Sequence, residues 1–225
     1  MTKPINVLIV EDEPLILTTL QRAFDCVSNS SKKWSFKLIT ARDCDSARLK
    51  IDKAERGLAF DLALLDINIP PSADKKLLSG EDLGIELRAL FRNIKIVVFA
   101  SHNQRFRVNN ILQSVKPNGL LIKTEIEFND LVRSIKVVLK GSPIYSKGVL
   151  QSIRMQISNK FTLDRIDRLL LFQLSLGTKT KDMPKLIGLS KGGIESRKRR
   201  LKELFCLDNA NDADLLKAAR DMGYV

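Results

Sequence analysis

Short apolar runs alternate with longer amphipathic segments over the first 140 residues of the chain. Each run is flanked by polar or turn-forming residues, which is typical of buried parallel strands. The predicted strands are residues 5–10, 36–40, 62–65, 94–100 and 120–123. The amphipathic helices predicted between and after them are residues 15–24, 45–54, 82–91, 106–115 and 128–139. Five β–α repeats in order predict an α/β domain with a doubly wound, five-stranded parallel sheet, whose strand C-termini share one edge.

The pattern changes after residue 140. Glycine, serine and proline interrupt residues 141–160, so we predict a linker there, of which residues 149–157 could be helical. From residue 161 onward the apolar spacing is helical throughout, with predicted helices at 164–176, 180–187, 190–205 and 212–222. We therefore predict an α/β domain over 1–140, a linker over 141–160 and a small all-α domain over 161–225.

The composition is that of a folded chain. Hydrophobic residues make up 44% and charged residues 28% of the 225 positions, which excludes a disordered protein. No apolar run reaches the roughly 18–20 residues that a membrane span needs, and the N-terminus lacks the layout of a signal peptide. Cys26, Cys44 and Cys206 lie far apart without metal-binding spacing, so we expect free thiols in a reducing compartment and a cytoplasmic protein.

Positive charge is concentrated in the second part of the chain. The formal net charge is +12, and residues 154–202 hold 13 basic and 4 acidic residues, a net of +9. The rest of the chain contributes only +3. A strongly basic segment beside a nearly neutral domain favours a polyanionic partner, usually nucleic acid. A basic face that simply contacts solvent is the alternative interpretation.

Acidic residues follow two of the predicted strands. Glu11 and Asp12 follow the first strand and Asp66 follows the third, so the topology brings their like charges to one edge of the sheet. Such a cluster is unfavourable unless a cation neutralises it, and carboxylate oxygens suit Mg²⁺. Lys123 ends the fifth strand and adds an ammonium group. A single acid here is more often a helix cap, but the four positions together predict a site that stabilises a phosphoryl group on a carboxylate.

The segments that carry these residues resemble the receiver domain of two-component response regulators. The matching segments are residues 7–13 (VLIVEDE), 64–70 (LLDINIP) and 119–123 (GLLIK). The resemblance implies that Asp66 is the phosphoacceptor and that Glu11 and Asp12 bind Mg²⁺. It also implies that Asn68 offers its backbone carbonyl to the metal and that Lys123 contacts the phosphoryl group.

Two positions depart from the receiver pattern. Receivers usually carry Thr or Ser at the end of the fourth strand, where this chain has Ala100 followed by Ser101. They also usually carry an aromatic residue early in the fifth strand, where this chain has Leu120. Ser101 could supply the hydroxyl if the strand register shifts by one. The alternative is a vestigial receiver on a regulator that binds DNA independently of phosphorylation.

The last 65 residues resemble the LuxR/NarL-type helix-turn-helix domain. The matching segments are residues 163–165, 177, 181–183, 189–194, 197–201 and 218–225. The resemblance implies that the helix after Ser190 enters the DNA major groove. It assigns base-edge contacts to Glu195, Ser196 and Arg199, with Arg199 suited to reading guanine. Phosphate contacts are expected from Lys191, Arg197, Lys198 and Arg200.

Two features of this domain are unusual. Gly192 and Gly193 lower helix propensity at the start of the recognition helix, so we expect that helix to start late or to order only on DNA. Pro184 is expected to bend or shorten the second helix. A basic helical bundle that binds protein or RNA is the alternative for this domain.

Together these features predict a transcription regulator that a sensor histidine kinase controls by phosphorylating Asp66 with Mg²⁺. We expect double-stranded DNA and a second copy of the chain as partners, in a homodimer on a two-fold site. No Gly-rich phosphate loop, Cys/His metal box or nucleophile elbow is present, and we do not expect an enzyme. We interpret His102, the only histidine, as an exposed loop residue. An effector that acts only through protein contacts is a third possibility.

Overall fold

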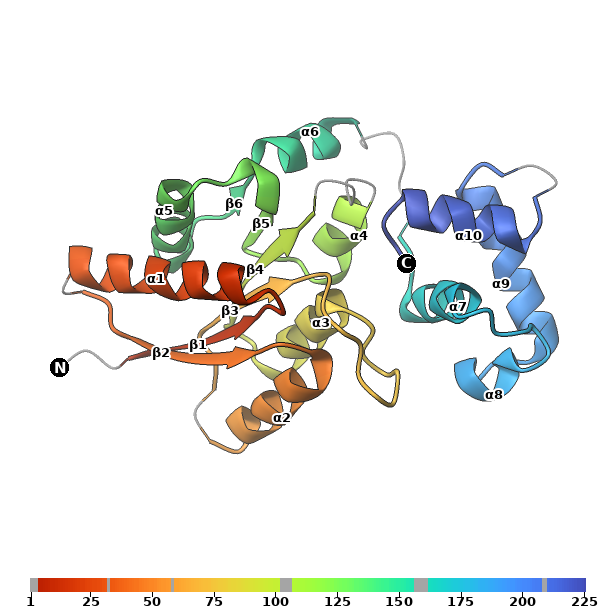
Figure 1. Ribbon diagram of the computed structural model, residues 1–225, viewed down its shortest axis with the longest axis horizontal. Helices are drawn as coiled ribbons and strands as arrows, with labels where there is room; N and C mark the ends of the chain where they lie inside the picture. Colours follow the sequence, from red (N-terminus) through yellow and green to blue (C-terminus); the bar gives the residue numbers. More distant parts are fainter. Residues whose placement is uncertain (1–3, 32, 58, 102–106, 156–161, 208–209) are drawn as a thin grey trace.

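The structure is a computed structural model, and it describes residues 4–31, 33–57, 59–101, 107–155, 162–207 and 210–225. An α/β domain and a helical domain lie side by side (Figure 1). In the described part of the chain, no helix is long and apolar enough to cross a membrane.

Six parallel strands form one sheet in the order β2-β1-β3-β4-β5-β6. The strands are β1 (Ile5–Val10), β2 (Phe36–Ala41), β3 (Leu62–Asp66), β4 (Lys95–Ala100), β5 (Gly119–Ile122) and β6 (Ile144–Tyr145). Strands β1, β3, β4 and β5 are almost entirely buried, as their continuous apolar runs predict for a sheet covered on both faces. The predicted doubly wound α/β class is confirmed.

Helices cover both faces of this sheet (Figure 1). Their bounds are α1 (Pro14–Ser30), α2 (Cys44–Glu55), α3 (Gly80–Leu90), α4 (Arg107–Ser114), α5 (Phe128–Leu139) and α6 (Lys147–Met155). Helices α1 and α5 pack on one face, where alternate strand residues such as Val7 and Ile9 point. Helices α2, α3, α4 and α6 pack on the other face, against Leu8 and Val10. The strand period of two thus supplies a separate core to each layer.

The sixth strand is a correction to the predicted five. Ile144 and Tyr145 pair with Gly119 and Leu120, and the amide of Ser146 donates to the carbonyl of Leu120 at 3.1 Å. Strand β5 would otherwise be an edge strand with unpaired backbone groups. Helix α6 follows at once, and its Val149 is fully buried in the sheet core. Both elements lie within residues 141–160, where we predicted a linker.

The described residues of the second domain form four helices: α7 (Arg165–Ser175), α8 (Met183–Ile187), α9 (Lys191–Leu204) and α10 (Asp212–Asp221). They enclose a core of their own. Asp164 caps α7 in a reciprocal capping box with Asp167, and Gly177 follows that helix with φ +73°. The predicted helix at 180–187 is shorter in the structure, because α8 begins at Met183 with Pro184 in its first turn.

Helix α9 begins at Lys191, in spite of its two glycines. The hydroxyl of Ser190 accepts a hydrogen bond from the amide of Gly193 at 3.1 Å and caps the helix. The expectation of a late start at Gly192–Gly193 is therefore wrong. Ile194 and Leu201 are fully buried and anchor the helix on the domain core.

Candidate functional site

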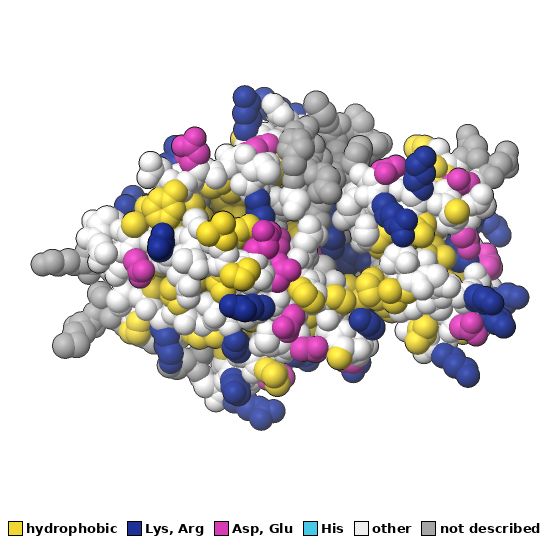
Figure 2. All heavy atoms as spheres, viewed as in Figure 1, with side chains coloured by type: hydrophobic (Ala, Val, Ile, Leu, Met, Phe, Trp, Pro, Cys, Tyr) yellow, Lys and Arg dark blue, Asp and Glu magenta, His cyan; other side chains and the backbone are white. Residues whose placement is uncertain are grey.

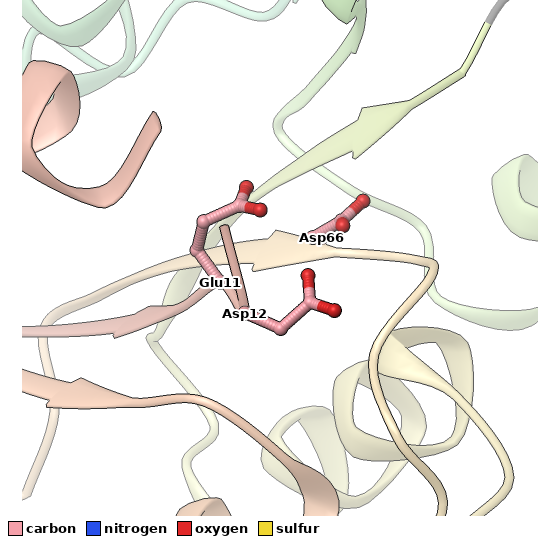
Figure 3. Close-up of side chains that lie close together, drawn as sticks. All are labelled: Glu11, Asp12 and Asp66. Atoms are coloured by element: carbon pink, nitrogen blue, oxygen red, sulfur yellow. The ribbon is translucent and has the colours of Figure 1, made fainter. Parts of the chain in front are cut away.

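Three carboxylates meet at the C-terminal edge of the sheet (Figure 3). Glu11 and Asp12 follow β1, and Asp66 is the last residue of β3. The parallel pairing of Val10 with Leu65 brings the two strand ends together. One oxygen from each carboxylate lies within 4.8 Å of the other two. Glu11 is fully buried, Asp66 is 2% exposed and Asp12 is half-buried.

Lys123 provides the positive charge at this edge. It lies in a single 3-10 turn, η2 (Lys123–Glu125), directly after β5. Its Nζ donates to Asp66 Oδ2 at 3.0 Å, to Glu11 Oε1 at 3.0 Å and to Glu13 Oε1 at 3.3 Å. Glu13 was not among the predicted site residues. Its side chain is largely exposed, and it stands at the mouth of the carboxylate cluster.

Burial and mutual repulsion raise the proton affinity of the cluster. Burial, together with the charge of Asp66, raises the pKa of Glu11 to about 7, although Lys123 opposes this change. Burial also raises the pKa of Asp66 above its usual range, against the opposing charge of Lys123. Burial alone would lower the pKa of Lys123, but the charges of Asp66 and Glu11 outweigh it and raise that pKa. The single ammonium group of Lys123 therefore does not neutralise the three carboxylates.

The oxygens of this cluster fit a hard divalent cation. Glu11 Oε2 and Asp66 Oδ1 are buried and have no hydrogen-bond partner among the described residues. A buried polar atom without a partner is costly, and a cation beside these two oxygens would remove that cost. The donors are all oxygens and Asp12 is open to water, which is the environment that Mg²⁺ prefers. Glu11, Asp12 and Asp66 are thus the residues that can hold the ion.

Asn68 and Ser101 lie next to each other beyond the ends of β3 and β4. The side-chain amide of Asn68 donates to the hydroxyl of Ser101 at 3.3 Å. Ala100 is fully buried and pairs with Ile122, so β4 keeps its register and Ser101 falls one residue beyond the strand. Leu120 is also fully buried in the core. His102 lies outside the described residues.

Helix α9 presents only some of the residues predicted to contact DNA to solvent. Lys191, Glu195, Ser196 and Arg199 are exposed, and none of the ion pairs among the described residues involves Lys191 or Arg199. Figure 2 shows Lys and Arg side chains, interspersed with acidic ones, over α8 and α9 at the end of the molecule away from the sheet. This face is therefore open to a polyanion.

Three of the predicted phosphate contacts are instead tied to acids of their own domain. Lys198 is 2% exposed, and its Nζ lies 2.6 Å from Asp212 Oδ2. Arg197 pairs with Asp164 at 2.6 Å and Asp167 at 2.7 Å. The half-exposed Arg200 lies 3.6 Å from Asp167. Lys198 points into the domain because it shares the face of α9 that carries Ile194 and Leu201.

A second group of ionisable residues lies buried between the two domains. Glu81 and Asp82 in the first turn of α3 pair with Arg168 of α7, and Glu81 also pairs with Arg107 of α4. Sequence reasoning missed this group because acids at the start of a helix are usually solvated caps. A possible signal was Arg168, a charged residue directly before the apolar residues 169–172.

Known proteins match this chain through structure rather than sequence. A scan against models of protein families matches none, and no curated protein matches the sequence. RcsB from Salmonella enterica serovar Typhimurium, bound to promoter rprA in the presence of the phosphomimetic BeF₃⁻, matches with a TM-score of 0.67 and 17% identity. That match covers 96% of this chain and 98% of the RcsB chain.

Two further RcsB structures also match this chain, one of them only in part. Two RcsB dimers bound to two parallel DNAs match with a TM-score of 0.57 and 17% identity, over 97% of this chain and 99% of that one. The isolated REC domain of Salmonella RcsB, also with BeF₃⁻, matches with a TM-score of 0.53 and 16% identity. It covers 67% of this chain and 99% of its own. At these identities the likeness establishes the fold, an α/β domain followed by a helical one.

Proposed function

We propose that this chain is a two-component response regulator, a DNA-binding transcription regulator that is controlled by phosphorylation of Asp66. One observation carries the proposal: Glu11, Asp12, Asp66 and Lys123 converge from three strands on one sheet edge, in a chain that ends in a helix-turn-helix. The shared fold with RcsB structures, solved on DNA and with BeF₃⁻, supports it. We also propose 1–140 as the receiver, completed by β6 and α6 from the connecting segment 141–160, and 161–225 as the DNA-binding domain.

In this proposal each site residue has a separate task. An oxygen of Asp66 attacks the phosphorus of a phosphohistidine on a sensor kinase, the P–N bond breaks, and the imidazole leaves and takes up a proton. Mg²⁺ held by Glu11, Asp12, Asp66 and the carbonyl of Asn68 would neutralise charge on the transferring group. Lys123 moves its hydrogen bonds from Asp66 to a phosphoryl oxygen.

Access to Asp66 requires a local movement. The residue is 2% exposed, and Lys123, whose side chain is 15% exposed, lies over its Oδ2. A lysine side chain reorients on a stem of four methylene groups, so it can uncover the carboxylate without any change in the sheet. Ser101, next to Asn68, is the proposed hydroxyl partner for the phosphoryl group in place of Ala100.

On the DNA side we propose that α9 occupies the major groove. Exposed Arg199, Glu195 and Ser196 would face base edges, and Lys191 would meet a phosphate. Arg197 and Arg200 could reach a phosphate only by leaving Asp164 and Asp167, and we withdraw Lys198 from this set because it is buried. A cytoplasmic homodimer on a two-fold DNA site completes the proposal.

The test combines a phosphoryl mimic with DNA binding. Mg²⁺ and BeF₃⁻ are added to wild type, to Asp66→Asn and to Asp25→Asn, an exposed acid on α1 that serves as the matched control. We expect a bound-BeF₃⁻ ¹⁹F resonance and a change in DNA affinity in wild type and in the control variant, and neither in Asp66→Asn. Wild-type regulation by Asp66→Asn would refute phosphorylation control. DNA affinity that does not depend on salt would refute the DNA interface.

A second candidate is a DNA-binding regulator whose receiver no longer responds to phosphorylation. Ala100 and Leu120 favour it, because both are fully buried apolar residues where the usual hydroxyl and aromatic relay would lie. It predicts salt-dependent DNA binding together with no response to BeF₃⁻. The same experiment therefore separates the two candidates.

A further inference from the structure

The contact between the domains is built on a buried network of charged groups. Glu81 is fully buried, and its Oε2 lies 3.1 Å from Nε of Arg107, while Ser114 donates to its Oε1 at 2.8 Å. Burial raises the pKa of Glu81, but the charges of Arg107 and Arg168 outweigh it, so the net pKa is lowered and the carboxylate stays ionised. Charged groups this deep must be paired, so the two domains depend on each other for neutralisation.

Arg168 is the helical domain's contribution to this network. Its side chain is 5% exposed, and one terminal nitrogen lies 2.7 Å from Asp82 Oδ1. The other lies 3.3 Å from Glu81 Oε1 and donates to the carbonyl of Leu163 at 3.0 Å. The amide of Leu163 in turn donates to the side chain of Asn110 on α4 at 2.6 Å. Helix α7 is thus fixed to α3 and α4 by directional bonds that a solvated surface contact would not provide.

The loop between β3 and α3 reinforces the same contact. Leu78 packs against the core of the helical domain, and Nζ of Lys75 lies 5.7 Å from the ring centre of Phe172. Arg165 donates to the carbonyl of Lys76 at 3.2 Å. This loop follows Asp66 directly along the chain. One short segment therefore joins Asp66 to the contact with the helical domain.

At its other end, α3 touches the backbone of Asp66. A Cβ on Gly80, the first residue of α3, would lie 1.9 Å from the carbonyl oxygen of Asp66. The amide of Gly80 donates to the carbonyl of Ile67 at 3.2 Å. The two acids of the interdomain network are the next two residues, so any displacement of the backbone at Asp66 moves them directly.

We propose that the first turn of α3 carries the state of Asp66 to the helical domain, with Glu81, Asp82 and Arg168 acting as an interdomain clamp that phosphorylation loosens. This inference rests on the proposed phosphorylation of Asp66. A phosphoryl group adds about −1.5 to −2 charges. A cavity of about 310 Å³, lined by Asn68, Arg107 and Arg168, connects the loop after Asp66 with the two guanidinium groups. The added charge attracts these arginines and repels the two carboxylates, and both effects weaken the clamp.

The clamp does not cover the recognition helix. Helix α9 lies on the far side of the helical domain from the sheet (Figure 1), and its outer face is exposed. Opening the clamp therefore lets the whole helical domain reorient relative to the α/β domain. It does not uncover α9, which is already exposed. The consequence that can be measured is a change in the distance between the domains.

Native cysteines provide the probes for this measurement. Cys26 on α1 and Cys206 after α9 are exposed and lie in different domains. Cys44 is fully buried, and burial raises the pKa of its thiol to about 12, so it does not react near neutral pH. Nitroxide labels on Cys26 and Cys206 report the interdomain distance by pulsed electron–electron double resonance. Excess unlabelled chain suppresses signals between protomers.

The experiment compares wild type with Arg168→Met, and with Lys185→Met as a control that removes an exposed cation on α8 of the same domain. For wild type and the control we expect one narrow distance distribution that broadens on adding Mg²⁺ and BeF₃⁻. For Arg168→Met we expect the broad distribution from the start, and no further change. A narrow distribution in Arg168→Met that responds like wild type would overturn the clamp.

A second variant guards against loss of folding. Asp82→Asn is nearly isosteric and keeps an acceptor for the amide of Leu78, and it removes the charge of the closer of the two acids that pair with Arg168. Asp82→Asn must broaden the distance distribution as Arg168→Met does. The double variant Asp82→Asn with Arg168→Met must give a distribution no broader than either single variant. If ¹⁹F spectra show BeF₃⁻ bound but the wild-type distance stays fixed, the clamp is refuted while the proposed function stands. If BeF₃⁻ does not bind, both the clamp and the proposed phosphorylation of Asp66 are refuted.

Discussion

Replacing Lys198 by methionine separates a structural lysine from a DNA-contacting one. The side chain of Lys198 is 2% exposed and donates to Thr180 and Asp212, with Glu195 3.8 Å away. Methionine keeps the aliphatic stem that packs in the domain and removes only the ammonium group. The variant therefore measures the contribution of the buried charge to the stability of the helical domain.

The expected cost follows from the exposure of the partners. Removing one member of a fully buried ion pair costs about 3–5 kcal/mol, because the other charge is left without a partner. Here the side chain of Asp212 is 43% exposed and Lys202 remains 3.4 Å from it, so most of that penalty is relieved. We expect a loss of about 1–3 kcal/mol in the free energy of unfolding. For a domain of this size, 1 kcal/mol lowers Tm by roughly 4–8 °C.

The assay localises that loss and compares it with DNA binding. Hydrogen exchange read by mass spectrometry should accelerate across α9 and α10, where Lys198 and Asp212 lie, and leave the sheet unchanged. The matched variant Arg199→Met removes an exposed charge one residue further along. It should change stability by less than about 0.5 kcal/mol, and reduce discrimination between DNA sites by roughly 1–3 kcal/mol.

An exchange of roles between the two variants would contradict the assignment of Lys198 to the domain core and of Arg199 to DNA. A stable Lys198→Met that loses affinity equally on all DNA sequences, with a salt slope smaller by about one, would make Lys198 a phosphate contact. The burial and pairing of its side chain would then not describe the state that binds DNA.

Three further outcomes follow from the same structure. Gly80→Ala should lower the stability of the α/β domain by about 1–3 kcal/mol or more, because its Cβ would overlap the carbonyl of Asp66, and urea unfolding measures the loss. Gly192→Ala should raise helical-domain stability by about 0.5–1 kcal/mol, since a Cβ there meets open space in α9, and an unchanged Tm would contradict it. Mg²⁺ should raise the Tm of wild type but raise that of Asp12→Asn less, in thermal scans with and without the ion.

The sequence predicted the sheet because its strands are short, apolar and buried on both faces. Strand β1 matches its prediction at both ends, and the helix at 128–139 matches α5. Helix α1 continues to Ser30, beyond the predicted end at residue 24, because Val27 extends its buried stripe from Leu20 and Phe24. Strand β6 was missed because two residues next to glycine and proline carry no periodic pattern. Only pairing with β5 makes them a strand.

The candidate site was predictable for a topological reason, and its surroundings were not. Parallel strands bring their C-terminal ends together whatever the side chains are, so acids at 11, 12 and 66 had to converge. The pairing of Lys198 with Asp212, or of Arg168 with Asp82, depends on how helices from distant segments pack. A basic residue on a basic helix has the same local pattern whether it contacts DNA or an acid of its own domain.

The two departures from the receiver pattern narrow the route that a signal can take. Ala100 and Leu120 are fully buried and apolar, so their side chains offer no hydrogen bond to a phosphoryl group and no rotating aromatic ring. Lys123 contacts Asp66 through its ammonium group, and Gly80 contacts it through the backbone. Lys123 also pairs with Glu11 and Glu13 within the same sheet edge, whereas Gly80 begins a helix whose next two residues pair with the other domain. A signal that leaves Asp66 for the helical domain therefore has its most direct path through α3.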